Sequence, residues 1–291
     1  MKYSKAIFGD NQFLGVNHAD QAVASELYKR FARPDAIIEV LGAAYEAGIR
    51  DFMFTTHDRY YPVFDEIKRS NLFPGLSYSP CLPYAHKYWT AMSERGLIPV
   101  VWSTISAINP LRIAPAMVSA AFGNFGGVLR LLTEVELLMC KGLPVRGVFQ
   151  QNVLFDLLLA MEAKGMIESY CRFVTDRLGV IPGFITMNHP QAVRMLCDDL
   201  GLEKPLLCAN LNVAGFRINP SQKAVEASFA SRRTNNIAMS VFSSRSGDVA
   251  RALDYVLAKQ GVDAVLFGSS SPANIARNAA AILGRPPRGA G

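Results

Sequence analysis

The chain has 291 residues, of which 50% are hydrophobic, with 30 Lys plus Arg against 24 Asp plus Glu. That length and apolar content suit one large core, and helix–strand barrels of about 250 residues commonly form a single domain. The net charge of +6 is dispersed and forms no basic stripe, so nucleic acid is not expected as a partner, whereas small anionic ligands are compatible with it.

The N-terminal part of the chain alternates short apolar runs with helical patterns. The apolar run 6–8 is followed by Asp10 and further polar residues, which predicts a strand or hairpin that delivers polar groups to a loop. Pro34 then opens a pattern typical of an amphipathic helix. The next buried strand, 52–54, runs directly into the dense polar cluster 55–60. In a parallel barrel such a position is the catalytic end.

The same alternation continues to the C-terminus, which favours a parallel sheet with crossover helices. We therefore predict the α/β class and a TIM (β/α)8 barrel in which residues 1–291 form a single domain, with a helical insertion around 106–141 over its mouth or flank. The sequence contains nine strand candidates, whereas a closed barrel needs eight. Either the first candidate forms a hairpin outside the barrel, or one of the two candidates around Cys81 and Trp102 is irregular. The candidates are 6–8, 52–54, 76–81, 98–103, 145–150, 181–186, 206–210, 237–241 and 264–267.

The last strand candidate leads into a corner that suits a phosphate. Three serines follow Gly268, Ser271 stands where a helix N-cap belongs, and Pro272 occupies the first helical position. Unpaired backbone N–H groups and hydroxyls would face the exit of the strand. An ordinary capped turn between strand and helix is the alternative. The residues predicted to hold the anion are Ser269, Ser270 and Ser271, assisted by Arg277 or Arg245, the latter otherwise a solvated loop arginine.

Three stretches resemble the aldo-keto reductase superfamily: AAYEAGIRDFMFTT, the segment MEAKGMIESYCRFVTDRLGVIPGFITMNHPQAVRML, and GVDAVLFGSSSPANIARNAAAI. The resemblance implies a TIM barrel. It also implies that the serine corner, together with Arg277 and Asn278, holds the phosphate of a nucleotide such as NADP.

The catalytic residues of that family do not carry over with the fold. The resemblance implies an Asp, a Tyr, a Lys and a His around the carbonyl. Their positions fall on Thr55, on Tyr60, on Ser103 or Thr104, and on Gln150 or Gln151. Only the tyrosine is retained, and an unperturbed tyrosine with a pKa of about 10 is a poor acid at neutral pH. Phe242 would be the aromatic that stacks on a nicotinamide, or else a core residue.

Polar residues that follow the strand candidates form an alternative acid–base set. His57 beside Asp58 offers an imidazole next to a carboxylate at the expected centre of the site. For each histidine a structural role is the alternative. A metal site built from His18, His57 and His189 with Asp10 or Asp58 is a further alternative, although no local spacing supports it. The predicted catalytic residues are His57, Asp58, Tyr60, Gln150, Asn188 and His189.

Three classes of function remain open. The first is a small-molecule enzyme with non-redox acid–base chemistry, of the lyase, isomerase or hydrolase type, on a phosphorylated or carbonyl substrate. The second is an NADP-dependent carbonyl oxidoreductase with a rebuilt active site, and the third a catalytically silent nucleotide-binding barrel. The cofactor is unknown, NADP being favoured over a divalent metal. No oligomeric state is predicted.

The cysteines and the apolar stretches bear on the location of the protein. Five cysteines lie in apolar surroundings without C-x-x-C spacing, which predicts reduced thiols in a cytoplasmic protein. No secretory signal is expected at the N-terminus. The uncharged stretch 113–129 is interrupted by one proline and three glycines, so no membrane span is expected there.

Overall fold

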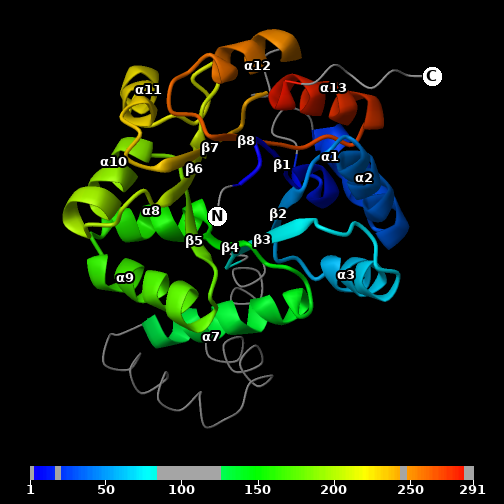
Figure 1. Ribbon diagram of the computed structural model, residues 1–291, viewed down its shortest axis with the longest axis horizontal. Coiled ribbons are helices and arrows are strands. Elements are labelled where there is room, and N and C mark those ends of the chain that lie inside the picture. The colour runs from blue at the N-terminus through cyan, green and yellow to red at the C-terminus, as the bar shows by residue number, and fades with distance from the viewer. Residues whose placement is uncertain (1–2, 17–20, 84–125, 243–247, 285–291) are drawn as a thin grey trace.

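A computed structural model describes residues 3–16, 21–83, 126–242 and 248–284. Eight parallel strands form a closed barrel in which the spatial order follows the chain and β8 pairs with β1. Helices surround this ring of strands (Figure 1). The predicted TIM (β/α)8 barrel is therefore confirmed. The strands are β1 Ala6–Phe8, β2 Asp51–Thr55, β3 Ser77–Leu82, β4 Gly147–Gln150, β5 Ile181–Thr186, β6 Leu206–Asn210, β7 Asn235–Met239 and β8 Ala264–Phe267.

The described helices follow the strands in the way that the sequence pattern predicts. Pro34 occupies the start of α2, and Ser271 caps α13 with Pro272 at its first position. The α-helices are α1 Gln21–Arg30, α2 Pro34–Glu46, α3 Tyr60–Arg69, α7 Gly126–Leu137, α8 Asn152–Ala160, α9 Lys164–Arg172, α10 His189–Val193, α11 Gln222–Ala230, α12 Val249–Leu257 and α13 Pro272–Leu283. Short 3-10 helices cover Asn11–Leu14 and Leu138–Cys140, and π-helical turns extend α9 over Phe173–Arg177 and α10 over Arg194–Asp199.

The first of the nine strand candidates belongs to the barrel. β1 is a barrel strand that pairs with β2 on one side and with β8 on the other, so it is not an outside hairpin. The candidate 98–103 lies outside the described residues, and so does the part 106–125 of the predicted insertion. The described remainder of that insertion contains α7 and the 3-10 helix that follows it.

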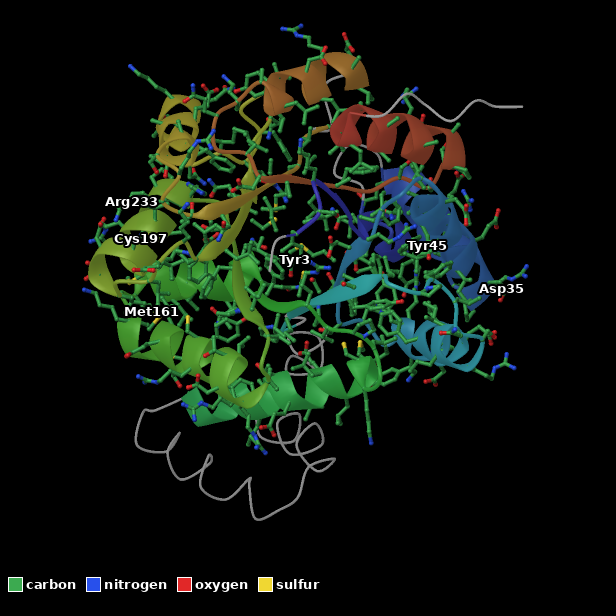
Figure 2. The ribbon with its side chains drawn as sticks, viewed as in Figure 1. Tyr3, Asp35, Tyr45, Met161, Cys197 and Arg233 are labelled. Carbon is green, nitrogen blue, oxygen red and sulfur yellow. The ribbon has the colours of Figure 1, made fainter. Side chains whose placement is uncertain are left out.

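Side chains of the strands point alternately into the barrel and toward the helices. The interior cluster consists of strand residues alone: Ile7, Met53, Cys81, Phe149, Leu206, Cys208, Ile237 and Ala264. The helix-facing side chains instead pack with α-helical residues, as Val148 does with α8 and α9. Tyr3 closes one end of the interior, where its hydroxyl lies 2.8 Å from Ser79 Oγ, and Figure 2 shows it at the centre of the ring of strands. The barrel is therefore a packed core, and a substrate has to bind at an end.

Helix α3 is held against the barrel by its apolar face. Tyr60, Val63, Phe64 and Ile67 recur every three to four residues and are all buried. Tyr60 stacks on Phe64 at 5.4 Å between ring centroids and meets Phe54 edge to face at 5.2 Å. Full burial of a large apolar side chain contributes about 1.5–3 kcal/mol. Packing of this kind sets the position of Tyr60 next to the ends of β1 and β2.

Three further observations concern the sequence predictions on cysteines and membranes. All five cysteines are free thiols, and four of them are buried. Burial raises the pKa of the Cys171 thiol to about 11, so this thiol stays protonated at neutral pH. Among the described helices, none is long and apolar enough to cross a membrane.

Candidate functional site

A buried carboxyl group joins the ends of the first two strands to helix α3. Asp10 follows β1, and its Oδ2 accepts hydrogen bonds from the backbone N–H of Thr55 at 2.7 Å and from the hydroxyl of Tyr60 at 3.1 Å. Its side chain is buried, with 6% of the residue exposed. Thr55 is the last residue of β2 and Tyr60 the first of α3, so Asp10 lies at the carboxyl end of the barrel. This is the end at which barrel enzymes carry their active sites.

The environment of Asp10 changes its acidity. Burial raises the pKa of Asp10 to about 7, although the hydrogen bonds from Thr55 and Tyr60 act in the opposite direction. For Tyr60, burial and the nearby charge of Asp10 both raise the pKa well above its ordinary value. At neutral pH Tyr60 therefore stays protonated, while Asp10 exchanges a proton readily between its two forms.

His57 lies in the tight turn between β2 and α3. Its backbone N–H donates to Thr55 O at 2.7 Å, and its Nδ1 accepts from the backbone N–H of Arg59 at 3.1 Å. Because Nδ1 acts as an acceptor, the neutral ring carries its proton on Nε2. His57 is partly exposed and Asp58 is exposed. The turn thus presents an imidazole and a carboxylate near the buried pair of Asp10 and Tyr60.

The two glutamines after Phe149 lie on different sides of the barrel wall. Phe149 belongs to the interior cluster and Val148 to the helix-facing one, so alternation turns Gln150 toward the helices. Gln150 is accordingly buried in a pocket with residues of α7, α8 and α9. Gln151 occupies the N-cap position of α8 without a side-chain capping bond, and its Nε2 donates to Cys81 O at 3.3 Å. In the sequence, the histidine of the aldo-keto reductases aligns with either Gln150 or Gln151. Because Gln150 points toward the helices, only Gln151 lies at the strand ends.

Asn188 and His189 are both engaged in holding α10. The Oδ1 of Asn188 accepts from the backbone N–H of Gln191, as a helix N-cap does. His189 is fully buried: its Nδ1 lies 2.8 Å from Ser228 Oγ and its Nε2 2.8 Å from Asn236 Oδ1. Burial lowers the pKa of His189 to about 4, so its ring is neutral at physiological pH. Both ring nitrogens of His189 therefore have side-chain partners, a geometry that favours the structural alternative.

Asn210, the last residue of β6, and Asn212, two residues further on, hold a loop at the same end of the barrel. Asn210 Nδ2 donates to Arg217 O at 2.7 Å. The Oδ1 of Asn212 accepts from the N–H of Phe216 at 2.8 Å, and its Nδ2 donates to Phe216 O at 3.0 Å. Both asparagines are buried. The side-chain amides of both residues are thus used to hold the loop.

The serine corner lies beside the loop that carries Asp10. Gly9 N–H donates to Phe267 O at 2.8 Å, so the exits of β1 and β8 adjoin. A Cβ added at Gly268 would lie 2.2 Å from Oε1 of Gln12 and 3.3 Å from Gly9 O, so the two loops are in direct contact. An anion at the serine corner would therefore be near the exit of β1.

The residues expected to bind an anion differ in their exposure and in their hydrogen bonds. Ser269 Oγ accepts from the N–H of Ser271 at 3.2 Å, and Ser271 Oγ accepts from the N–H of Asn274 at 3.4 Å. Ser270 is partly exposed beside them. Arg277 is exposed and donates to Asn274 Oδ1 at 2.9 Å, whereas Asn278 faces inward and its Oδ1 has no hydrogen-bond partner. Arg245 lies outside the described residues.

The described part of the chain contains no cluster of side chains that would support the alternative of a metal site. Within residues 3–16, 21–83, 126–242 and 248–284, no group of three or more His, Cys, Asp and Glu side chains is placed to hold a metal ion. His18, one of the ligands considered, lies outside these ranges, and so do Ser103 and Thr104.

Comparisons with known proteins agree on the fold. No protein-family model and no curated protein sequence matches the chain. Among solved structures, the chain is similar to a protein of Pseudomonas aeruginosa assigned to the aldo-keto reductases, with a TM-score of 0.60 and 12% identity over 97% of this chain and 90% of the other. It is also similar to the glycerol dehydrogenase of Gluconobacter oxydans, with a TM-score of 0.56 and 10% identity over 97% and 86% of the two chains. A structure assigned as a 2,5-diketo-D-gluconic acid reductase B matches with a TM-score of 0.54 and 12% identity over 98% and 84%. The chain thus has the barrel fold of the aldo-keto reductase structures.

Proposed function

We propose that the chain is a divergent aldo-keto reductase-like enzyme that performs proton transfer on a small carbonyl or phosphorylated molecule, with Asp10 as the group that moves the proton. The observation that carries this proposal is a buried carboxyl group with a pKa of about 7 at the carboxyl end of the barrel. A catalytic acid or base works best when its pKa lies near the operating pH. Asp10 meets that condition at neutral pH.

The reductase mechanism has less support from these residues. The resemblance to the aldo-keto reductases implies a tyrosine that gives its proton to the carbonyl oxygen, and the pKa of Tyr60 is raised by burial and by the charge of Asp10. The positions of the family's Asp and His are taken by Thr55 and by a glutamine, neither of which carries a charge. Tyr60 therefore serves Asp10 as a hydrogen-bond donor.

The remaining polar groups supply binding and a second proton-transfer group. His57, with its proton on Nε2, is partly exposed at the next strand exit, and Asp58 is its exposed neighbour. The N-terminus of α13 with Ser269 and Ser270 would hold a phosphate or carboxylate of the substrate, because backbone N–H groups and the helix dipole both favour an anion. Arg277 adds a positive charge on the exposed face of that helix.

An NADP-dependent oxidoreductase is the second candidate. The reductase and dehydrogenase assignments of the similar structures favour it. On this reading the serine corner holds the phosphate of the nucleotide, together with Arg277 and Asn278. The two candidates differ in whether a hydride is transferred.

Exchange of substrate protons with solvent tests the first candidate. The protein is incubated in D2O with a panel of ketones, beginning with dihydroxyacetone phosphate and dihydroxyacetone, and loss of the α-proton signal is followed by NMR against a protein-free blank. A general base should make exchange faster than the blank, and Asp10→Asn should lower the enzymatic rate by about 10²–10⁴-fold. The matched control is Asp35→Asn, which makes the same change at an exposed carboxylate on α2 paired with Arg33. Equal exchange rates in the Asp10 variant and the wild type would refute the role of Asp10.

A nucleotide titration tests the second candidate with the same proteins. NADPH fluorescence reports binding, and the loss of its absorbance in the presence of aldehydes reports hydride transfer. The first candidate expects no oxidation of NADPH above the blank. Robust oxidation that survives both Asp10→Asn and His57→Ala would establish the oxidoreductase instead. Tight NADPH binding with neither exchange nor oxidation would indicate a silent nucleotide-binding barrel.

A further inference from the structure

The turn between β2 and α3 closes over three residues. The backbone N–H of His57 donates to Thr55 O at 2.7 Å, so Thr56 is the central residue of a γ-turn. The residue before it gives its own N–H to Asp10 at 2.7 Å, and the residue after it carries the imidazole. The position of Thr56 therefore affects both proton-transfer groups of the proposed site.

The side chain of Thr56 is held from outside the turn. Thr56 is buried, with 1% of the residue exposed, and its hydroxyl donates to Oε2 of Glu136. Cys81 O lies 3.5 Å from the same hydroxyl, at the limit of a hydrogen bond, so the carboxyl group is its main acceptor. Glu136 is also buried and belongs to α7, 80 residues further along the chain. One side chain thus ties the γ-turn to a distant helix.

Glu136 belongs to an element that is packed against the helix layer. Met139, which follows α7, lies in the same buried cluster as Tyr60 and Phe64 of α3. An acceptor anchored in this way holds Thr56 in place at little entropic cost, because packing has already fixed its own position. The bond therefore adds order to the turn itself.

We propose that Glu136 is a positioning residue of the acid–base site: through Thr56 it fixes the turn 55–57, and thereby the imidazole of His57 relative to Asp10. Glu136 acts through Thr56 and not on the substrate. The catalytic consequence rests on the function proposed above. The order that Glu136 imposes on the turn is a property of the folded chain and can be measured without any substrate.

Hydrogen exchange of two backbone amides, followed by NMR of the full-length protein in D2O, measures the order of the turn. The N–H of His57 donates to Thr55 O, and the N–H of Arg59 donates to His57 Nδ1. Thr56→Val removes the hydroxyl, and Glu136→Met removes the acceptor. Loss of this one hydrogen bond should make both amides exchange about fivefold faster, while amides of the barrel strands keep their rates.

A matched control and a conservative variant assign the effect to this contact. Thr133→Val makes the same change at a buried threonine of α7 whose hydroxyl donates to Leu129 O inside the helix, so the turn amides should exchange as in the wild type. Glu136→Gln keeps an oxygen that can accept from Thr56, and its turn amides should exchange more slowly than those of Glu136→Met. The double variant Thr56→Val/Glu136→Met should exchange no faster than either single variant, because both remove the same bond.

The ketone exchange assay measures the catalytic consequence. In Thr56→Val, kcat should fall by about tenfold or more with KM little changed, since misplacing a catalytic group by about 1 Å can cost about 10²-fold. Thr133→Val should keep the wild-type kcat. A wild type that exchanges no ketone proton would refute the proposed function alone, because the amide rates still report on the turn.

Each result decides for or against the positioning role. Acceleration confined to Thr56→Val and Glu136→Met, together with the fall in kcat, supports it. Turn amides that exchange at the wild-type rate in these two variants overturn it, as does an equal acceleration in Thr133→Val. Faster amides with an unchanged kcat also overturn it, since the turn would then not position the catalytic group. Either Thr56→Val or Glu136→Met decides the outcome if the other does not fold.

Discussion

The protonation of Asp10 should make the stability of the protein depend on pH in an unusual direction. Most carboxyl groups in folded proteins are stabilised in their charged form, so folding lowers their pKa. Folding instead raises the pKa of Asp10, from an ordinary 3.8 to about 7, chiefly through burial. Between these two values the folded protein binds more protons at this residue than the unfolded chain does. The contribution of Asp10 to stability must therefore fall as the pH rises through this interval.

The size of the effect follows from the same two values. A rise from 3.8 to about 7 corresponds to roughly 4 kcal/mol of unfolding free energy lost between about pH 4 and pH 8. Substitution by Asn removes the charge while retaining an amide oxygen that can accept from the N–H of Thr55. Asp10→Asn should thus be insensitive to this titration. Its stability relative to the wild type should improve by roughly 4 kcal/mol between the acid and the alkaline end of the interval.

Urea denaturation followed by circular dichroism at half-unit steps from pH 4 to pH 8 measures this difference. Comparison of the two proteins cancels the other titrating groups, including His189. A constant difference in unfolding free energy between wild type and Asp10→Asn across the whole range would refute the reasoning. It would mean that Asp10 is not desolvated, and the proposed catalytic role would lose its physical basis.

Three further predictions concern the titration of His189, the packing around Gly261 and the N-cap of α13. Burial lowers the pKa of His189 from 6.5 to about 4, so the wild type should lose roughly 3 kcal/mol of unfolding free energy as the pH falls through that interval. His189→Gln should show no such loss. Parallel pH profiles of the unfolding free energy of the two proteins, measured in urea, would contradict this. Gly261→Ala places a Cβ 1.9 Å from Phe229 O at a φ of +81° and should lower the unfolding free energy by about 3 kcal/mol or more. The control Gly201→Ala has a similar φ of +65° but open space around the Cβ, and should lower it by only about 1–2 kcal/mol. Equal losses of unfolding free energy in urea denaturation would exclude the steric explanation. Ser271→Ala removes the N-cap of α13 and should cost about 1 kcal/mol in thermal unfolding, while an unchanged melting temperature would show that the cap is dispensable.

Much of the barrel could be predicted because its signals are local. The run 264–267, the serine at the N-cap and Pro272 at the first helical position specify a strand, a turn and a helix within a few residues. The same holds for α2, which starts at Pro34. Backbone stereochemistry and capping act over one or two turns of chain, so neighbouring residues are sufficient to reveal them. The surplus strand candidate could not be resolved locally, since an apolar run has the same pattern wherever it packs.

The candidate site was harder to predict, because its contacts join residues that are distant in the sequence. The acceptor Asp10 and its donors are 45 and 50 residues apart along the chain. Its raised pKa comes from burial by surrounding elements, which no local motif encodes. The partners of His189 are also distant in the sequence. A histidine after a strand suggested chemistry, while Ser228 and Asn236, 39 and 47 residues away, occupy both of its ring nitrogens.

By itself, the sequence determined the parallel barrel and the polar character of the carboxyl ends of its strands. Those features follow from the period of the apolar residues and from the short reach of turns and caps. Only the tertiary structure decided that Asp10 is paired with Tyr60, and that Gln150 belongs to the helix layer while Gln151 stands at the strand end. Register and solvent exclusion set these outcomes, and both depend on which distant segments close around a side chain.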